Sequence, residues 1–86
     1  MRILIPSPLQ SYTTGARHVS AAGGNLGQVL ADLDRQFPGI RFRMIGEQDR
    51  VRPHMMIYVR GARTRDLSTC LEENEEVVIM QALSGG

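Results

Sequence analysis

The last residues of the chain are the ones whose types and order could do chemistry. The sequence closes on QALSGG, so Ser84 leads into Gly85 and Gly86 and a bare carboxylate. Glycine lacks Cβ, so such an arm can thread a narrow channel and leave its terminal carbonyl carbon open to attack. ATP can convert a carboxylate to an acyl-adenylate, and a sulfur nucleophile can then displace AMP to leave a thiocarboxylate. Chain ends are also often small and polar without any role, so residue types alone leave both interpretations of residues 83–86 open.

No other group of residues predicts a catalytic or metal site. His18 and His54 are far apart in the sequence, and no other ligand type clusters with either of them. The stretch GGNLG has no lysine and follows a weak strand, which makes it unlike a phosphate-binding loop. We therefore expect a protein that is not an enzyme and binds no cofactor, with ATP and Mg²⁺ used by a partner enzyme.

Composition limits the class of protein. The chain has 86 residues, a net charge of +1 and a pI near 8.0, which predicts one domain and no nucleic-acid partner. No stretch approaches the roughly 18 apolar residues of a membrane helix, and the N-terminus does not resemble a signal peptide. Cys70 is the only cysteine, which favours a reducing, cytoplasmic location. It lies beside Leu67 and Leu71, and we predict a buried structural thiol, since a reactive cysteine needs an exposed electropositive setting.

Apolar residues recur at helical spacing from residue 26 to residue 37, which predicts an amphipathic helix. Its apolar face consists of Leu26, Val29, Leu30, Leu33 and Phe37. Asn25 is a good N-cap, and Pro38 and Gly39 end the helix. Residues 40–53 are predicted to be irregular.

Strands are predicted on both sides of that helix. Arg2–Ile5 and Arg17–Ala21 should pair as a hairpin, residues 54–61 form a strand that turns at Gly61, and residues 76–82 form the last strand. Residues 62–71 begin as a weak strand, and Asn74 can hold a left-handed conformation in the turn before the last strand. One helix must cover one face of a mixed sheet. The predicted fold is therefore α+β, a β-grasp (ubiquitin-like) arrangement of four to five strands in a single domain over residues 1–82, followed by a flexible tail at 83–86.

Strand alternation assigns the apolar residues to two faces of this sheet. Met55, Ile57, Val59, Val77 and Ile79 should point at the helix. Met56, Tyr58, Val78 and Met80 then line the opposite face, which no second helix is available to cover. A contiguous apolar patch of this kind on a small domain predicts a docking surface for a partner, although scattered exposed apolar residues are also common.

Two groups of charges remain ambiguous. Arg41, Arg43, Arg50 and Arg52 form a basic group that we interpret mainly as a solvated loop. Glu72, Glu73, Glu75 and Glu76 precede the last strand; they are interpreted as a solvated turn, with guidance of the tail toward a basic enzyme surface as the alternative. All ten basic residues are arginine, and lysine is absent.

Four segments resemble the small ubiquitin-like sulfur carriers, which include the small subunit of molybdopterin synthase and the thiamine-pathway and cysteine-pathway carriers. The segments are RILIPSPLQSYTTG, LGQVLADLDRQFPGI, HMMIYVRGARTRDL and EEVVIMQALSGG. The resemblance implies a β-grasp fold in which Gly86 carries the adenylate and then the thiocarboxylate. The sequence departs from such carriers at two turns, where Arg60-Gly61 replaces the frequent Asn-Gly and Asn74-Glu75 replaces the frequent Gly-Asp.

The resemblance also implies partners: an adenylating activating enzyme, a sulfur donor and an acceptor enzyme of a biosynthetic pathway. The spacing between helix and hairpin favours the molybdopterin or cysteine type by resemblance. A protein modifier joined to targets through Gly86 is an alternative, limited to single attachment or linear fusion because the chain lacks lysine. A binding module without tail chemistry is a third.

Overall fold

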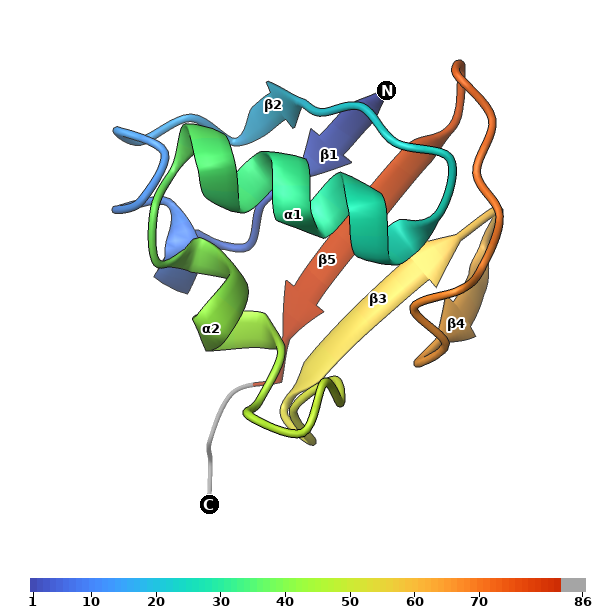
Figure 1. Ribbon diagram of the computed structural model, residues 1–86. Helices are drawn as coiled ribbons and strands as arrows, with labels where there is room; N and C mark the ends of the chain where they lie inside the picture. The colour runs from blue at the N-terminus through green and yellow to red at the C-terminus, as the bar shows by residue number, and fades with distance from the viewer. Residues whose placement is uncertain (83–86) are drawn as a thin grey trace.

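A computed structural model describes residues 1–82 of the chain, and the predicted tail at 83–86 lies outside the described residues. A mixed sheet lies behind one long helix and one short helix (Figure 1). The elements are β1 (Arg2–Leu4), a 3-10 turn (Ser7–Leu9), β2 (His18–Ser20), α1 (Leu26–Gln36), α2 (Ile40–Met44), β3 (Met55–Val59), β4 (Ala62–Thr64) and β5 (Glu76–Gln81).

Strand β5 is the middle strand of the sheet, whose order is β2-β1-β5-β3-β4. It pairs in parallel with β1 and antiparallel with β3, while β1 and β2 pair antiparallel. The predicted pairing of the first two strands is therefore confirmed, and the last strand lies beside the first. This is the β-grasp arrangement expected from the sequence.

Helix α1 covers one face of this sheet (Figure 1). The Asn25 side chain accepts a hydrogen bond from the Gln28 N–H at 2.8 Å, an N-cap that typically contributes about 1 kcal/mol. The residues of α1 that are buried are Leu26, Val29, Leu30 and Leu33. They pack on the inward residues of the sheet, which are Ile3, Met55, Ile57, Val59, Val77 and Ile79.

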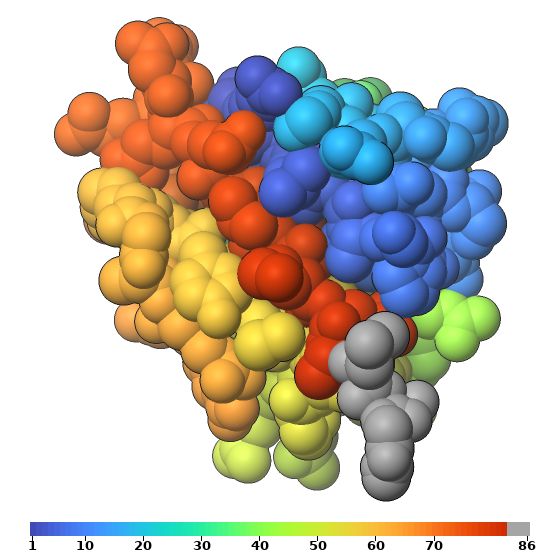
Figure 2. Space-filling model, turned by 180° about the vertical axis from the view of Figure 1, so that it is seen from behind, coloured from blue at the N-terminus to red at the C-terminus, as the bar shows by residue number. Residues whose placement is uncertain are grey.

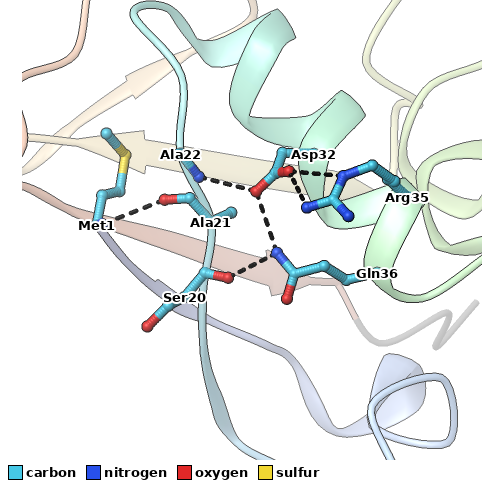
Figure 3. Close-up of polar contacts among 7 residues, drawn as sticks. All are labelled: Met1, Ser20, Ala21, Ala22, Asp32, Arg35 and Gln36. Atoms are coloured by element: carbon cyan, nitrogen blue, oxygen red, sulfur yellow. Dashed lines mark hydrogen bonds and ion pairs between the residues drawn. The ribbon is translucent and has the colours of Figure 1, made fainter.

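Asp32 ties the outer side of α1 to the segment that follows β2 (Figure 3). Its carboxylate accepts hydrogen bonds from the Ala22 N–H at 3.0 Å, from Arg35 at 2.7 Å and from Gln36 at 3.1 Å. The Gln36 amide also donates to the Ser20 carbonyl at 2.9 Å. One carboxylate thus fixes the distance between β2 and the helix.

The prediction that residues 40–53 are irregular was wrong at its start, where α2 spans Ile40–Met44. Ile40 and Met44 are one helical turn apart and both are fully buried. The helix begins after Gly39, whose φ of 97° turns the chain sharply. Five residues with two arginines carry too little periodicity to predict a helix, and burial of two side chains decides the outcome.

The predicted burial of Cys70 was also wrong, because this thiol is exposed. Cys70 forms an isolated bridge with Asn25, so side chains alternate across an extended segment. Leu71 takes the buried position and Leu67 packs against the core. The two leucine neighbours are therefore the residues that pack inward, and Cys70 is not among them.

The β3–β4 hairpin turns at Arg60 and Gly61, which hold φ values of 53° and 77°. A two-residue turn with both φ values positive matches the twist of the strands it joins, and an arginine there costs roughly 1–2 kcal/mol. The Arg60 guanidinium donates to Glu75 at 2.5 Å and to the Cys70 carbonyl at 3.3 Å. These contacts offset the strain. Asn74, in contrast, is not among the described non-glycine residues with positive φ.

Lowering the pH should weaken the Asp32 contacts. The Ala22 N–H and then Arg35 hold the pKa of the Asp32 carboxyl below its usual 3.8. Because the folded pKa is the lower one, the stabilisation is complete above the unfolded pKa and is lost as pH falls through the folded pKa. In urea unfolding from about pH 6 to about pH 2, the difference between wild type and Asp32→Asn should shrink. Glu47→Gln, at an exposed position, is the control, and a constant difference across this range would contradict the assignment.

The exposed position of Cys70 predicts rapid modification of the native protein. A thiol reagent such as Ellman's should react fully without denaturant, at a rate close to that in guanidinium. A buried thiol would react orders of magnitude more slowly, since it must wait for local unfolding. Cys70→Ser supplies the blank, and strong native-state protection would show that the side chain is buried after all.

Candidate functional site

The face of the sheet opposite α1 is uncovered. Figure 2 shows the molecule from this side, where β5 runs diagonally between β3 and β1 with no helix in front of it. Met56 lies directly opposite Met80, and Tyr58 lies directly opposite Val78. The four residues predicted for the docking face therefore form one contiguous patch on β3 and β5. Their role in binding a partner stays a prediction.

Exposure is uneven across this patch. Met80 is 48% exposed, while Met56, Tyr58 and Val78 are half-buried. The Tyr58 hydroxyl lies 3.8 Å from the Met56 sulfur, so these two side chains are held against each other. Methionine is the most adaptable apolar side chain, and Met80 is thus the residue of the patch best placed to fill a partner's pocket.

Sequence reasoning missed Leu4 as a member of the open face. Leu4 pairs with Val78 in the parallel β1–β5 ladder, so its side chain shares the face of Val78 and Met80. Its neighbours Ile3 and Ile5 are buried. The stretch Arg2–Ile5 has no polar residue between its apolar ones, so only the register, which the sequence does not show, could have assigned Leu4.

Two shallow hollows flank Met80 on this face. One, of about 510 Å³, is lined by Tyr58, Arg60, Gly61, Glu75, Glu76, Val78 and Met80. The other, of about 520 Å³, lies toward β1 and β2 and includes Leu4, Pro6, Arg17, His18, Met80 and Gln81. The Met80 side chain is therefore a ridge between two depressions.

The acidic residues lie at the beginning of β5, which is the end opposite the tail. Glu75 pairs with Arg60 at 2.5 Å, and Glu76 pairs with Arg2 at 3.3 Å across the β1–β5 ladder. The second oxygen of Glu75 is buried without a hydrogen-bond partner. A six-residue strand spans about 20 Å. This separation removes the basis for the interpretation that the acidic run guides the tail.

The last described residues, Gln81 and Ala82, form the root of the tail. The Ala82 N–H donates to the His54 carbonyl at 2.8 Å, and Gln81 pairs with Met55. Beside Gln81 is a polar hollow of about 270 Å³, lined by Pro8, Leu9, Ser11, Tyr12, Arg43, His54 and Gln81. Three segments far apart in sequence thus meet where the chain leaves the sheet.

Arg43 is held at this root by contacts with Tyr12. Its Nε donates to the Tyr12 hydroxyl at 2.7 Å, and its guanidinium lies 5.9 Å from the Tyr12 ring centroid. The hydrogen bond to Tyr12 raises the pKa of Arg43 further above its usual value.

The basic group that was predicted to be a solvated loop is partly engaged in other contacts. Arg41 pairs with Asp49, and Arg52 stacks on Phe42, so the prediction is partly wrong.

Within residues 1–82 no three His, Cys, Asp or Glu side chains are grouped as metal ligands. No helix of this part of the chain is long and apolar enough to cross a membrane. The predicted site residues Ser84, Gly85 and Gly86 lie outside the described residues, so their role stays a prediction.

Comparison with known proteins agrees with this geometry. The sulfur carrier protein CysO of Mycobacterium tuberculosis is 33% identical over 89 residues, which cover 98% of this chain and 96% of that protein. Its crystal structure matches with a TM-score of 0.89 at 29% identity, covering 95% of this chain and 98% of that one.

Two more distant structures share the fold alone. The BexX/CysO complex of Amycolatopsis orientalis matches at a TM-score of 0.90 and 23% identity, over 99% of this chain and 98% of the other. SAMP1 of Haloferax volcanii matches at a TM-score of 0.79 and 21% identity, over 100% of this chain and 98% of the other. Residues 3–86 match the ThiS family. The chain therefore belongs to the ThiS family of ubiquitin-like sulfur carriers, which carry sulfur and are not themselves catalysts.

Proposed function

We propose that this carrier holds sulfur as a thiocarboxylate on Gly86 and serves a cysteine-type pathway. A partner enzyme that uses ATP and Mg²⁺ adenylates the terminal carboxylate, and a sulfur donor displaces AMP. The single observation that carries the proposal is the 33% identity to CysO over almost the whole of both chains. This similarity favours the cysteine type over the molybdopterin type.

The open sheet face is the proposed docking surface for the partner enzymes. Met56, Tyr58, Val78 and Met80 lie on the strand that leads into the tail or on its neighbour β3. A partner that grips this face receives the tail in a fixed direction, because β5 is held on both sides by hydrogen-bonded strands. The complex of A. orientalis CysO with BexX shows that a relative in fold assembles with a partner protein.

A protein modifier is the second candidate, since the same activated tail could acylate lysines of other proteins. This chain contains no lysine. Its one amine, at the N-terminus, donates to the Ala21 carbonyl at 3.1 Å and lies beside the beginning of β5, where Arg2 pairs with Glu76, whereas Ala82 follows the other end of that strand. Chain building is therefore disfavoured, and single attachment remains as the alternative outcome of the tests.

Activation should be visible as a change in intact mass. With the adenylating enzyme of the same organism, ATP, Mg²⁺ and a sulfur donor, the chain should gain the mass difference between one sulfur and one oxygen atom. A variant that ends at Ser84 is the matched control and should gain nothing. If wild type shows no gain in mass while the same enzyme adenylates another carrier protein, the proposed thiocarboxylate mechanism is contradicted. Lysine-linked conjugates in extract would favour the modifier.

Docking through the open face predicts a large effect of charge at Met80. Met80→Asp should raise the KM of the carrier about tenfold or more in ATP–pyrophosphate exchange, because a buried hot-spot residue contributes about 1.4 kcal/mol or more. Phe42→Asp is the matched control, since Phe42 is 56% exposed and lies on α2, away from this face. Both variants should keep the circular dichroism of wild type. Equal effects at both positions would argue against the open face as the docking surface.

A further inference from the structure

Two arginines and two histidines lie around the root of the tail. The two hollows that include Gln81 contain Arg17 and His18 on one side, and Arg43 and His54 on the other. Neither hollow has an aspartate or glutamate among its described lining residues. We call these four residues the basic collar.

The two arginines of the collar have no acidic partner within residues 1–82, as is also true of Arg50, Arg52, Arg63 and Arg65. Four arginines form salt bridges in the described part of the chain, namely Arg2, Arg35, Arg41 and Arg60. Within residues 1–82, Arg17 and Arg43 form none. The acidic run at the beginning of β5 is too far away to neutralise them, so the collar faces outward with its charge uncompensated by the described residues.

Tyr12 presets the position of Arg43. The Tyr12 ring packs against the core, and its hydroxyl accepts from Arg43 Nε at 2.7 Å. The two terminal nitrogens of Arg43 make no hydrogen bond to residues 1–82. A guanidinium held in this way can present two parallel N–H groups to a carboxylate, with less entropy lost on binding.

We propose that the basic collar binds carboxylate side chains of the activating enzyme at the mouth of the channel that takes the tail, with Arg43 as the anchor. This inference rests on the proposed function and adds a second contact surface, beside the open sheet face. An acidic protein is favoured over nucleic acid because the chain carries a net charge of only +1. Opposite charges at the point where the tail enters the enzyme increase the rate of association and orient the two proteins.

The test is ATP–pyrophosphate exchange by the adenylating enzyme of the same organism, measured against carrier concentration. Arg43→Gln should raise KM about five- to tenfold with little change in kcat, and Arg43→Lys should recover only part of this loss, because it keeps the charge but not the paired N–H groups. Arg65→Gln is the matched control, since Arg65 is exposed and lines neither hollow of the collar. It should stay within about twofold of wild type. Thermal unfolding of each variant checks that the fold is kept.

The salt dependence of KM distinguishes a charge contact made by Arg43 from a purely structural role of this residue. The KM of wild type should rise steeply as sodium chloride increases from about 50 to 300 mM, and that of Arg43→Gln should rise less. Equal KM values and equal salt slopes for wild type and Arg43→Gln would overturn the inference while leaving the proposed function intact. A lower KM in Arg43→Gln would also overturn it, since the collar would then restrain the chain's own terminal carboxylate. No exchange with wild type would remove the proposed function and the inference together.

Discussion

A single amphipathic helix can cover only one face of a sheet, and the rest of this structure depends on that limit. Residues Val77 and Ile79 of β5 are buried under α1, so Val78 and Met80 must face the other way. The same alternation in β3 sends Met56 and Tyr58 to the same side. The described residues, 1–82, include no second long helix to cover them. The open face is therefore a consequence of how the core is built.

The direction of β5 then arranges charge along the molecule. The strand begins among glutamates that are partly paired with Arg60 and Arg2, and it ends between the two halves of the basic collar. In the proposed function an enzyme that takes the tail meets the apolar face along the strand and the cations at its end. Apolar burial would supply most of the affinity, and the charges would set orientation.

Sequence alone predicted the parts of the fold in which local pattern and tertiary packing agree. The cap at Asn25 and the helical spacing after it predicted α1, and β-branched alternation predicted β5 with both of its faces. Helix α2 was missed because the burial of Ile40 and Met44 outweighs a weak local pattern, and the exposure of Cys70 was missed because its neighbour Leu71 takes the buried position. The contact between Tyr12 and Arg43 joins residues 31 positions apart, and no local signal in the sequence could have shown it.

In the proposed function the terminal carboxyl group becomes reactive, and the use of arginine rather than lysine at all ten basic positions fits that role. Lysine is a primary amine and would compete with sulfur for an acyl-adenylate, whereas arginine stays protonated and is a poor nucleophile at neutral pH. The collar lies at the root of the tail, where such competition would be strongest. The N-terminal amine is bonded to the Ala21 carbonyl at the far end of the sheet. Arginine therefore lets this end of the molecule attract an acidic partner without offering a primary amine to its own acyl group.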